Sequence, residues 1–189
     1  MTTSNIKNQN SQLGGDQYEN SGIIRGAIQQ GPHILAIDEF GNYPINPDSA
    51  QEPNPYSLLT ISDEGTINRM LTNFYLEIKP FAGLTARVQA GMDKGNSSRN
   101  TYLPRTTLWG EKENGRASIA TQQKNDDLFD FTLNYTKKLK EDHSLNLLLG
   151  YSQQKQRNET SSVGNSDFIT DSFLWNNMNA GAGTKVVGS

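Results

Sequence analysis

The side chains that could do acid–base or metal chemistry are few and widely separated in this sequence. The only histidines are His33 and His143, and there is no cysteine. Metal sites require several such ligands at set spacings, which two distant histidines do not provide. The acids Asp126-Asp127, Glu111 and Glu113 have the residue type of glycoside hydrolysis, but solvated acids at strand and loop ends are commonplace. We predict no catalytic residue, no metal, no cofactor and no enzyme activity.

Aromatic residues in the loops are the better candidates for ligand binding. Sugars stack on exposed aromatic faces, and aromatic side chains also recognise proteins. The alternative interpretation is local loop packing or an aromatic girdle at a membrane interface. The candidate ligand contacts are Tyr102, Trp109, Phe173 and Trp175.

Length and composition exclude several classes of protein. The 189 residues are 33% hydrophobic, and 17 Lys and Arg stand against 20 Asp and Glu. The length predicts about one domain, and the charge balance lacks the basic field of nucleic-acid binders. No apolar stretch is long enough for a transmembrane helix. The first residues also lack the apolar core of a secretory signal, so the sequence as written predicts a cytoplasmic chain.

Nearly strict alternation of apolar and polar residues begins at Asn68. Residues 68–79 and 84–94 alternate on either side of the short turn Pro80-Phe-Ala-Gly83. Such alternation is typical of a strand with one apolar and one polar face. The two segments therefore predict a long antiparallel hairpin.

The same pattern returns later in the chain. Residues 117–137 and 143–156 alternate on either side of a charged turn that runs from Lys137 to His143. This predicts a second long hairpin, with a long loop joining the two. The organisation is then a loop region over 1–67, two hairpins over 68–157 and the start of another loop over 158–189.

The strands read as longer than those of most soluble sheets. Soluble strands average about 5–6 residues, whereas a tilted membrane strand needs about 9–11. Short turns on one side and long loops on the other are typical of outer-membrane barrels. Two interpretations remain open: part of a membrane β-barrel, or a soluble β-rich carbohydrate-binding module whose apolar faces cover a core.

The first 67 residues give weaker signals. Residues 1–20 read as loop or frayed strand, and 21–31 read as a short helix that ends at Gly31-Pro32. Residues 32–38 predict a short extended segment. Four prolines between 44 and 56 forbid a regular helix or strand ladder.

Several motifs, taken in order, resemble the SusC/RagA-like TonB-dependent outer-membrane transporters. Gly22-Ile-Ile-Arg-Gly, the turn Asp38-Glu-Phe-Gly-Asn-Tyr43 and Asn54-Pro55-Tyr-Ser-Leu-Leu resemble loops of that family. Asn68-Arg69 with Leu71, Asn73 and Tyr75 is similar to a strand that opens a hairpin of the barrel. Further similar stretches are Gly83-Leu84 with Arg87, Gly91 and Asp93; Tyr102-x-Pro104; Gly115-x-Ala117; His143 to Tyr151; and Trp175-Asn-Asn.

The resemblance implies a fold and a set of partners. It implies part of a large all-β outer-membrane barrel in a Gram-negative bacterium, with short periplasmic turns and long extracellular loops. The parent protein would import glycans or peptides with a SusD-like surface lipoprotein, and TonB would act through a plug that this chain lacks. No nucleic acid is implied. The residues expected to face lipid are Phe74, Leu76, Ile78, Val88, Phe131, Leu133, Leu147 and Leu149; those expected to face the lumen are Arg69, Arg87, Gln89, Asp130, Asn134 and Asn146.

Overall fold

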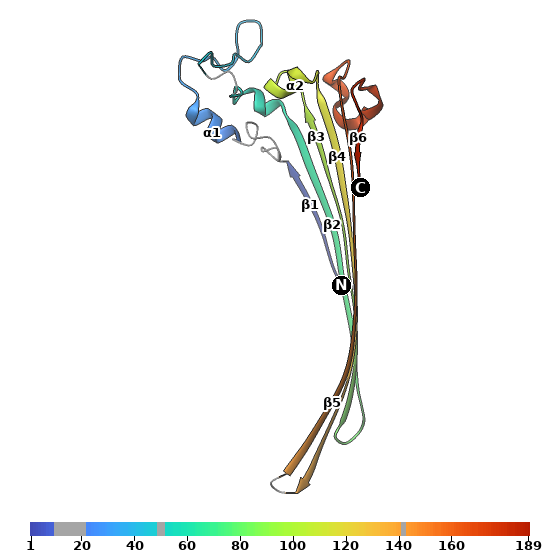
Figure 1. The fold of residues 1–189 in the computed structure, drawn as a ribbon. Coiled ribbons are helices and arrows are strands. Elements are labelled where there is room, and N and C mark those ends of the chain that lie inside the picture. Colours follow the sequence, from blue (N-terminus) through green and yellow to red (C-terminus); the bar gives the residue numbers. More distant parts are fainter. Residues whose placement is uncertain (10–21, 49–51, 141–142) are drawn as a thin grey trace. The chain divides into compact units, whose positions relative to one another are not determined.

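A computed structural model describes residues 1–9, 22–48, 52–140 and 143–189 of the chain (Figure 1). The chain divides into two compact units. The first unit contains Met1–Asn5, Ile67–Asn96 and Gln122–Glu159. The second unit contains Ile6–Thr66, Ser97–Thr121 and Thr160–Ser189.

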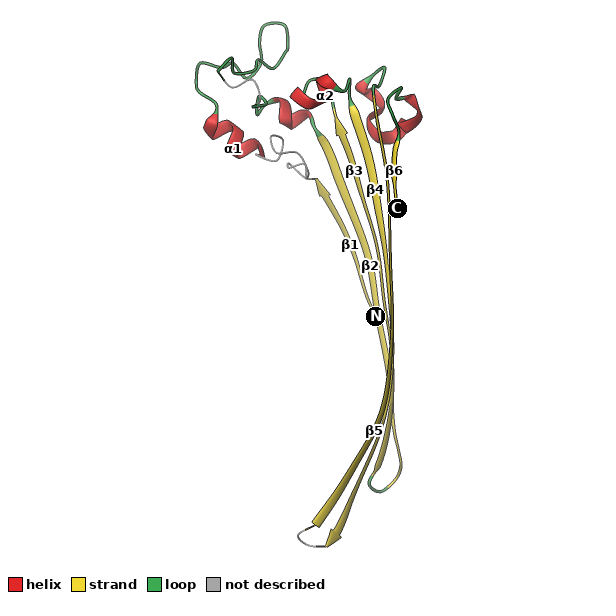
Figure 2. Ribbon diagram, in the orientation of Figure 1, coloured by secondary structure: helices red, strands yellow, loops and turns green. Residues whose placement is uncertain are grey.

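Strands make up most of the described residues (Figure 2). In chain order the elements are β1 (Thr2–Gln9), α1 (Gly22–Gln29), η2 (Ser57–Thr60), β2 (Ser62–Phe81), β3 (Leu84–Leu103), α2 (Leu108–Lys112), β4 (Arg116–Lys140), β5 (His143–Ser166), η3 (Asp171–Ala180) and β6 (Val186–Gly188). Among the described residues, no helix has both the length and the apolar character needed to cross a membrane.

The strands form one sheet in the order β1-β2-β3-β4-β5-β6. Neighbours in the sequence are therefore neighbours in the sheet, as in an antiparallel meander. The last pair is antiparallel, with Val163 opposite Val187. The predicted all-β fold of long antiparallel hairpins is confirmed.

The turn between β2 and β3 depends on a glycine. Gly83 has a φ of +90°, a conformation that L side chains rarely adopt. A Cβ at this position would also lie 2.3 Å from the carbonyl oxygen of Thr136 on β4. Both the φ angle and the close approach of the β4 backbone therefore favour glycine at this turn.

Exposed apolar side chains recur at alternate positions of the first unit. On β2, Phe74, Leu76 and Ile78 are each at least half exposed, and on β5 the same holds for Leu147 and Leu149. A soluble domain would bury a face of this kind. The described strands form a single sheet, so the opposite face is uncovered as well, with Tyr75 and Leu148 exposed. The alternating apolar character of these positions, rather than their exposure, is what suits a lipid-facing surface.

Three side-chain pairs join β2 to β3 at steps of six residues. Arg69 donates to Asp93 through Nε at 2.8 Å and Nη2 at 2.5 Å. Arg99 forms the same two-pronged contact with Asp63, and the guanidinium of Arg87 lies 5.2 Å from the ring centre of Tyr75. Because strand faces alternate with period two, six-residue steps keep all the β2 members on one face. These side chains form a polar column along the hairpin.

The second unit has a small core of its own. Tyr102 and Ala117 are fully buried, and Phe168 is almost so. The rings of Tyr102 and Phe168 meet edge to face at 5.7 Å. Four side chains of η3 then pack against this core: Leu174, Trp175, Met178 and Ala180. The η3 segment is thus folded onto the sheet rather than projecting from it.

The strands continue beyond the ranges that alternation marks. β3 runs to Leu103 and β5 to Ser166, so much of the expected long loops is strand. Polar pairs such as Thr121–Ser161 hold the extra length together. Both faces are polar there, so the sequence period disappears although the ladder persists. The expected extended segment over 32–38 is wrong: these residues form turns and bends.

The helix expected over 21–31 is seen as α1, and a sixth strand, β6, lies in the expected final loop. Residues 2–9 form β1, whereas residues 10–20 lie outside the described residues. Residues 141 and 142 of the charged turn also lie outside them.

Candidate functional site

A hollow of about 430 Å³ lies in the second unit, within the range of small-ligand sites. Four strands and the segments before β4 and β6 supply its walls. The lining residues are Arg99, Thr101, Leu103, Glu113, Arg116, Ala117, Ser118, Ser162, Gly164, Asn165, Ser166, Thr184 and Val186.

Strand alternation explains which side chains reach this hollow. On β3 the lining positions 99, 101 and 103 are odd, and on β5 positions 162, 164 and 166 are even. These are the parities of the polar faces predicted from the sequence. Tyr102, of the opposite parity on β3, belongs to the core under η3 instead. Ala117 and Asn165, whose positions have the parity of the opposite face, also line the hollow, so most but not all of its strand residues belong to the face expected to line the barrel lumen.

Two arginines with acidic partners give the hollow its electrostatics. The side chain of Asp63 is fully buried, and its hydrogen bonds to Arg99 raise the pKa of that guanidinium. Arg116 donates Nη1 to Glu113 Oε1 at 3.1 Å. Side chains of this second pair remain about one third exposed. Arg99 is 43% exposed although its partner Asp63 is buried, so neither pair is enclosed in the wall.

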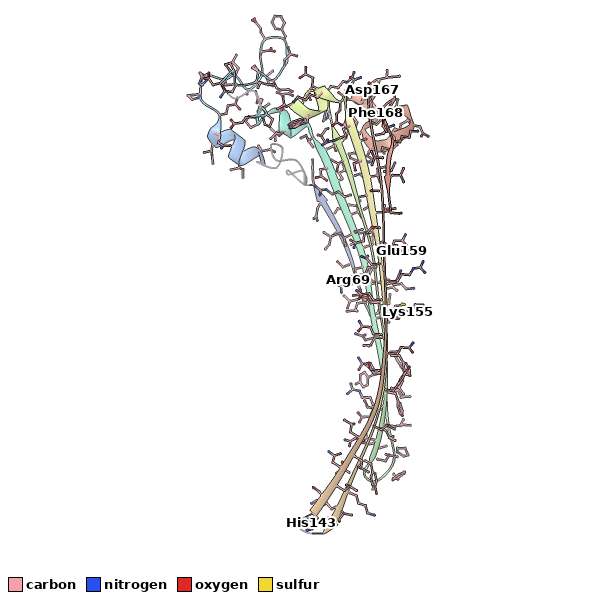
Figure 3. The ribbon with its side chains drawn as sticks, in the orientation of Figure 1. Arg69, His143, Lys155, Glu159, Asp167 and Phe168 are labelled. Atoms are coloured by element: carbon pink, nitrogen blue, oxygen red, sulfur yellow. The ribbon has the colours of Figure 1, made fainter. Side chains whose placement is uncertain are left out.

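The η3 segment is held to the strands by a partly buried hydrogen-bond network. The Tyr102 hydroxyl donates to Asp171 Oδ1 at 2.7 Å, and Arg105 Nε donates to the same oxygen at 3.2 Å. Burial, assisted by the bond to Asp171, raises the pKa of the Tyr102 hydroxyl well above its usual range. Asn165 Nδ2 donates to the carbonyls of Met178 and Gly181. These contacts fix η3 against β3 and β5, and Figure 3 shows Asp167 and Phe168 where that segment leaves β5.

A second region held together by side-chain hydrogen bonds to the backbone lies in the loop that follows α1. Asn54 is almost fully buried, and its Nδ2 reaches the carbonyls of Leu35, Ala36 and Pro44 at 2.9 to 3.3 Å. Its Oδ1 accepts from the Tyr56 amide at 2.9 Å. One amide side chain therefore ties together three stretches of irregular backbone, which have no ladder to satisfy them.

The turn at Asp38 is closed in a similar way. Asp38 Oδ1 accepts the amides of Phe40 and Asn42, and Oδ2 accepts Asn42 Nδ2. The backbone bond from Asn42 is the largest cause that lowers the pKa of this carboxyl. The turn holds Phe40 outward with 83% of its surface exposed.

The four predicted aromatic contacts fall in different surroundings. Tyr102 has no exposed surface, so its ring is not accessible to a ligand. Trp175 packs on the core of the second unit, and Trp109 lies 4.0 Å beneath the ammonium of Lys112. Phe173 is half exposed. None of the four lines the hollow.

The titratable residues considered from the sequence are not brought together. His33 follows α1 in a turn, and His143 is the first residue of β5 (Figure 3). Within the described part of the chain, no three His, Asp or Glu side chains group as metal ligands. Asp126 contacts Lys124 at 2.9 Å, and Glu113 contacts Arg116. Both acids are therefore members of ion pairs.

Sequence reasoning missed the residues that line this hollow. Arg99 and Arg116 lie in stretches read as loop or strand edge, without alternation to assign them a face. The available signal was the polar column itself: Asp63 and Arg99 continue the six-residue spacing of Arg69 and Asp93. Extending the hairpin register past its apolar part would have found that pair.

A second, shallower hollow of about 330 Å³ lies in the first unit. It includes Arg87, Gln89 and Asp130, which the sequence places on the lumen face. Asp130 accepts a hydrogen bond from Ser152 at 2.5 Å. Phe131, which is expected to face lipid, and Tyr151 also line this hollow, so it is not confined to the expected lumen face.

Comparisons with known proteins identify the class. A search of family models finds no match. The chain is 31% identical over 163 residues to TonB-dependent receptor P3 of Formosa agariphila, covering 86% of this chain and 16% of that protein. It is 25% identical over 160 residues to TonB-dependent receptor P39 of the same organism, covering 82% of this chain and 15% of that one. The chain thus spans about a sixth of the length of these relatives.

Solved structures agree on the fold. The RagAB peptide transporter matches with a TM-score of 0.55 and 21% identity, over 71% of this chain and 16% of that one. The RagAB peptide importer in its closed-closed state gives the same values. The sheet has the fold of part of a transporter β-barrel. The resemblance to SusC/RagA-like TonB-dependent transporters is confirmed: this chain is similar to one region of them.

Proposed function

We propose that this chain forms a section of the barrel wall of a TonB-dependent transporter in the outer membrane of a Gram-negative bacterium. The transporter imports oligosaccharides or peptides, with a SusD-like lipoprotein covering its extracellular loops and TonB acting through its plug. The observation that carries this proposal is the similarity to TonB-dependent receptor P3 over 86% of the chain.

The two faces of the strands support the same proposal. Exposed Phe74, Leu76 and Leu147 would meet lipid, while the hollows on the polar face would contribute to the substrate path. A soluble carbohydrate-binding module would instead place those apolar side chains in a core. The second unit would lie at the extracellular end of the barrel. Its η3 packs on the core, its loops are held by side-chain hydrogen bonds, and it would present residues such as Phe173 and Phe40 to partners.

The test is uptake by the intact transporter. The gene that encodes this chain is expressed in a Gram-negative host, and the import of labelled oligosaccharide and oligopeptide mixtures is measured with and without functional TonB. We expect import of one of the two mixtures, abolished without TonB, and the protein in the outer-membrane fraction. TonB-independent import, or a protein recovered in the soluble fraction, would contradict the proposal.

A further inference from the structure

Apolar side chains form a band of limited length on one face of the first unit. The band consists of alternate positions in residues 70–78 of β2, 84–92 of β3, 129–135 of β4 and 145–151 of β5. All of these positions are uncharged, and apart from Thr72 they are apolar. The same face becomes polar further along the strands, so the band has a definite length.

Contacts on the opposite face show how the strands are aligned. Arg69 of β2 bonds Asp93 of β3, and a Cβ at Gly95 of β3 would lie 4.0 Å from the Cβ of Lys124 on β4. The odd positions of β2 and β3 therefore share a face with the even positions of β4. The apolar band occupies the other face of these three strands.

The length of the band is that of a membrane-spanning strand. On β4 the band lies between Asp127 and Lys137 of the same face, with nine positions between them. On β5 it lies between His143 and Lys155, with eleven positions between them. A tilted membrane strand needs about 9–11 residues. The two strands have 25 and 24 residues, so each extends well beyond the length that crosses a bilayer.

The band ends at one level on β4 and β5. Ser152 donates to Asp130 at 2.5 Å, so the even positions of these two strands share the opposite face. Three residues further along each strand, this alignment places Lys155 opposite Asp127. On β3 the band also ends at a charged residue, Lys94.

Aromatic rings pair near both ends of the band. The ring centres of Phe129 and Tyr151 lie 6.5 Å apart, near the end that Asp127 marks. Those of Phe81 and Tyr135 lie 6.4 Å apart, next to the short turn. Outer-membrane barrels carry girdles of aromatic residues at both interfaces, where one side of the ring is apolar and the other wet. The two pairs lie where the borders of a bilayer would require them.

Beyond the band, the same face of β5 carries charges. Arg157 and Glu159 form an ion pair there, and their side chains are 67% and 49% exposed. In Figure 3, Lys155 and Glu159 lie on the side of the sheet opposite to Arg69. Charged groups are costly in hydrocarbon. This part of the face therefore suits water or lipid headgroups rather than lipid tails.

We propose that lipid tails cover only this band, and that the outer border of the hydrocarbon crosses β4 between Phe129 and Asp127 and β5 between Tyr151 and Lys155. The inner border lies at the two short turns, since short turns are periplasmic in barrels of this type. This placement rests on the proposed function, which puts the chain in a barrel wall. It adds the level of the membrane, and it leaves the charged strand segments beyond the band outside the hydrocarbon.

The experiment measures the depth of β5 in the full-length transporter reconstituted in lipid vesicles. This chain contains no cysteine. Single cysteines at Leu147, Leu149, Lys155 and Glu159 can therefore carry a nitroxide label once any cysteines elsewhere in the transporter are replaced. Collision of the label with oxygen, which concentrates in hydrocarbon, is compared with collision with a water-soluble nickel chelate. We expect the ratio of oxygen to nickel collisions to fall severalfold between Leu149 and Lys155.

The matched controls are Asn146 and Gln154, on the opposite face of the same strand. The nickel chelate should reach both positions, because successive side chains of a strand point to opposite faces, and the ratio should stay low. Insertion of each variant is checked by its heat-modifiable mobility on gels. A variant that fails to insert is replaced by the residue two positions along the same face, for example Arg157 in place of Lys155.

The outcomes separate this placement from the transport function. A ratio that stays high at Lys155 and Glu159, or that has already fallen at Leu149, would overturn the placement of the border. Poor access of both reagents to Leu147 and Leu149 would also overturn it, because protein would then cover the face. Import that does not depend on TonB, with the expected depth profile, would contradict the transport function alone. TonB-dependent import with a displaced profile would contradict only this placement.

Discussion

Asp63 on β2 is fully buried, and Arg99 on β3 closes it with two hydrogen bonds of 2.8 and 2.5 Å. A buried carboxylate that loses its paired guanidinium retains its desolvation cost without that compensation. Arg99→Met should therefore destabilise the folded barrel by about 2 kcal/mol, at the lower end for such pairs because the arginine is partly exposed. The free energy of unfolding in urea with lipid vesicles measures this.

The matched control for that prediction is Arg69→Met. Arg69 makes the same two-pronged contact with Asp93, but its side chain is 58% exposed. Water can replace the lost partner there, so we expect a clearly smaller effect than at Arg99. Equal losses for the two variants would show that burial of Asp63 is not what makes its pair important.

Tyr102 and Asp171 give a second prediction, for the anchoring of η3. Tyr102→Phe keeps the ring contact with Phe168 and removes only the hydroxyl bond to Asp171. We expect a loss of about 1–2 kcal/mol, near the value for a hydrogen bond to a charged group, since Arg105 still holds Asp171. Tyr151→Phe is the control, because its hydroxyl makes only an exposed 3.4 Å contact.

Asn54 gives a third prediction, for the loop after α1. Asn54→Ala removes the donor shared by three carbonyls, and we expect about 2 kcal/mol of local destabilisation. Limited proteolysis should then cut between residues 31 and 57 faster than in the wild type. Asn46→Ala is the control, since Asn46 makes one exposed bond to the Asp48 amide. Unchanged protease resistance in Asn54→Ala would contradict the role of Asn54 in holding this loop together.

The Asp38 turn should respond to acid. Because the folded-state pKa lies below the unfolded value near 3.8, the contribution of this carboxylate is complete above that value. It is lost as the pH falls through the lower, folded-state pKa. Amide exchange at Phe40 and Asn42 should accelerate in that range, and Asp38→Asn should remove this pH dependence. An identical acid response in Asp38→Asn would assign it to another group.

The two faces of β5 give a fifth prediction. Leu147→Arg places a charge on the expected lipid face, where it should cost about 2–4 kcal/mol near the midplane of the bilayer. Asn146→Arg places the same charge on the expected lumen face and should cost little. Refolding yield in lipid vesicles measures both. Equal tolerance at the two positions would contradict the orientation of this strand.

Much of the sheet could be predicted from the sequence, because alternation is a local signal. The apolar positions of β2 and β5 follow directly from it. The extra length of β3 and β5 could not be predicted in that way, since a strand that is polar on both faces shows no alternation of apolar and polar residues. The packing of Tyr102 under η3 could not be predicted either, because Asp171 and Phe168 come from a distant part of the chain. Tertiary contacts of that kind leave no local pattern.

The candidate site likewise depends on tertiary contacts that leave no local pattern in the sequence. Loop aromatics such as Trp109 attract attention because their residue type is rare and suits ligands. The hollow is instead built from Arg99, Arg116 and common hydroxyl residues. Their types are ordinary, and only the pairing of four strands brings them together. Motifs in the first loops, such as the one containing Asn54, have a structural role, because their side chains hydrogen-bond to the backbone of neighbouring loop segments.

The six-residue column on β2 and β3 also bears on how the hairpin finds its alignment. A slip by one residue turns every side chain to the wrong face, so a slip by two is the nearest plausible error. A slip that moved the partners apart would separate Asp63 from Arg99, Arg69 from Asp93 and Tyr75 from Arg87 at once, because the three pairs share the same six-residue spacing. The column therefore favours one alignment of the two strands, even where each exposed contact adds little to stability.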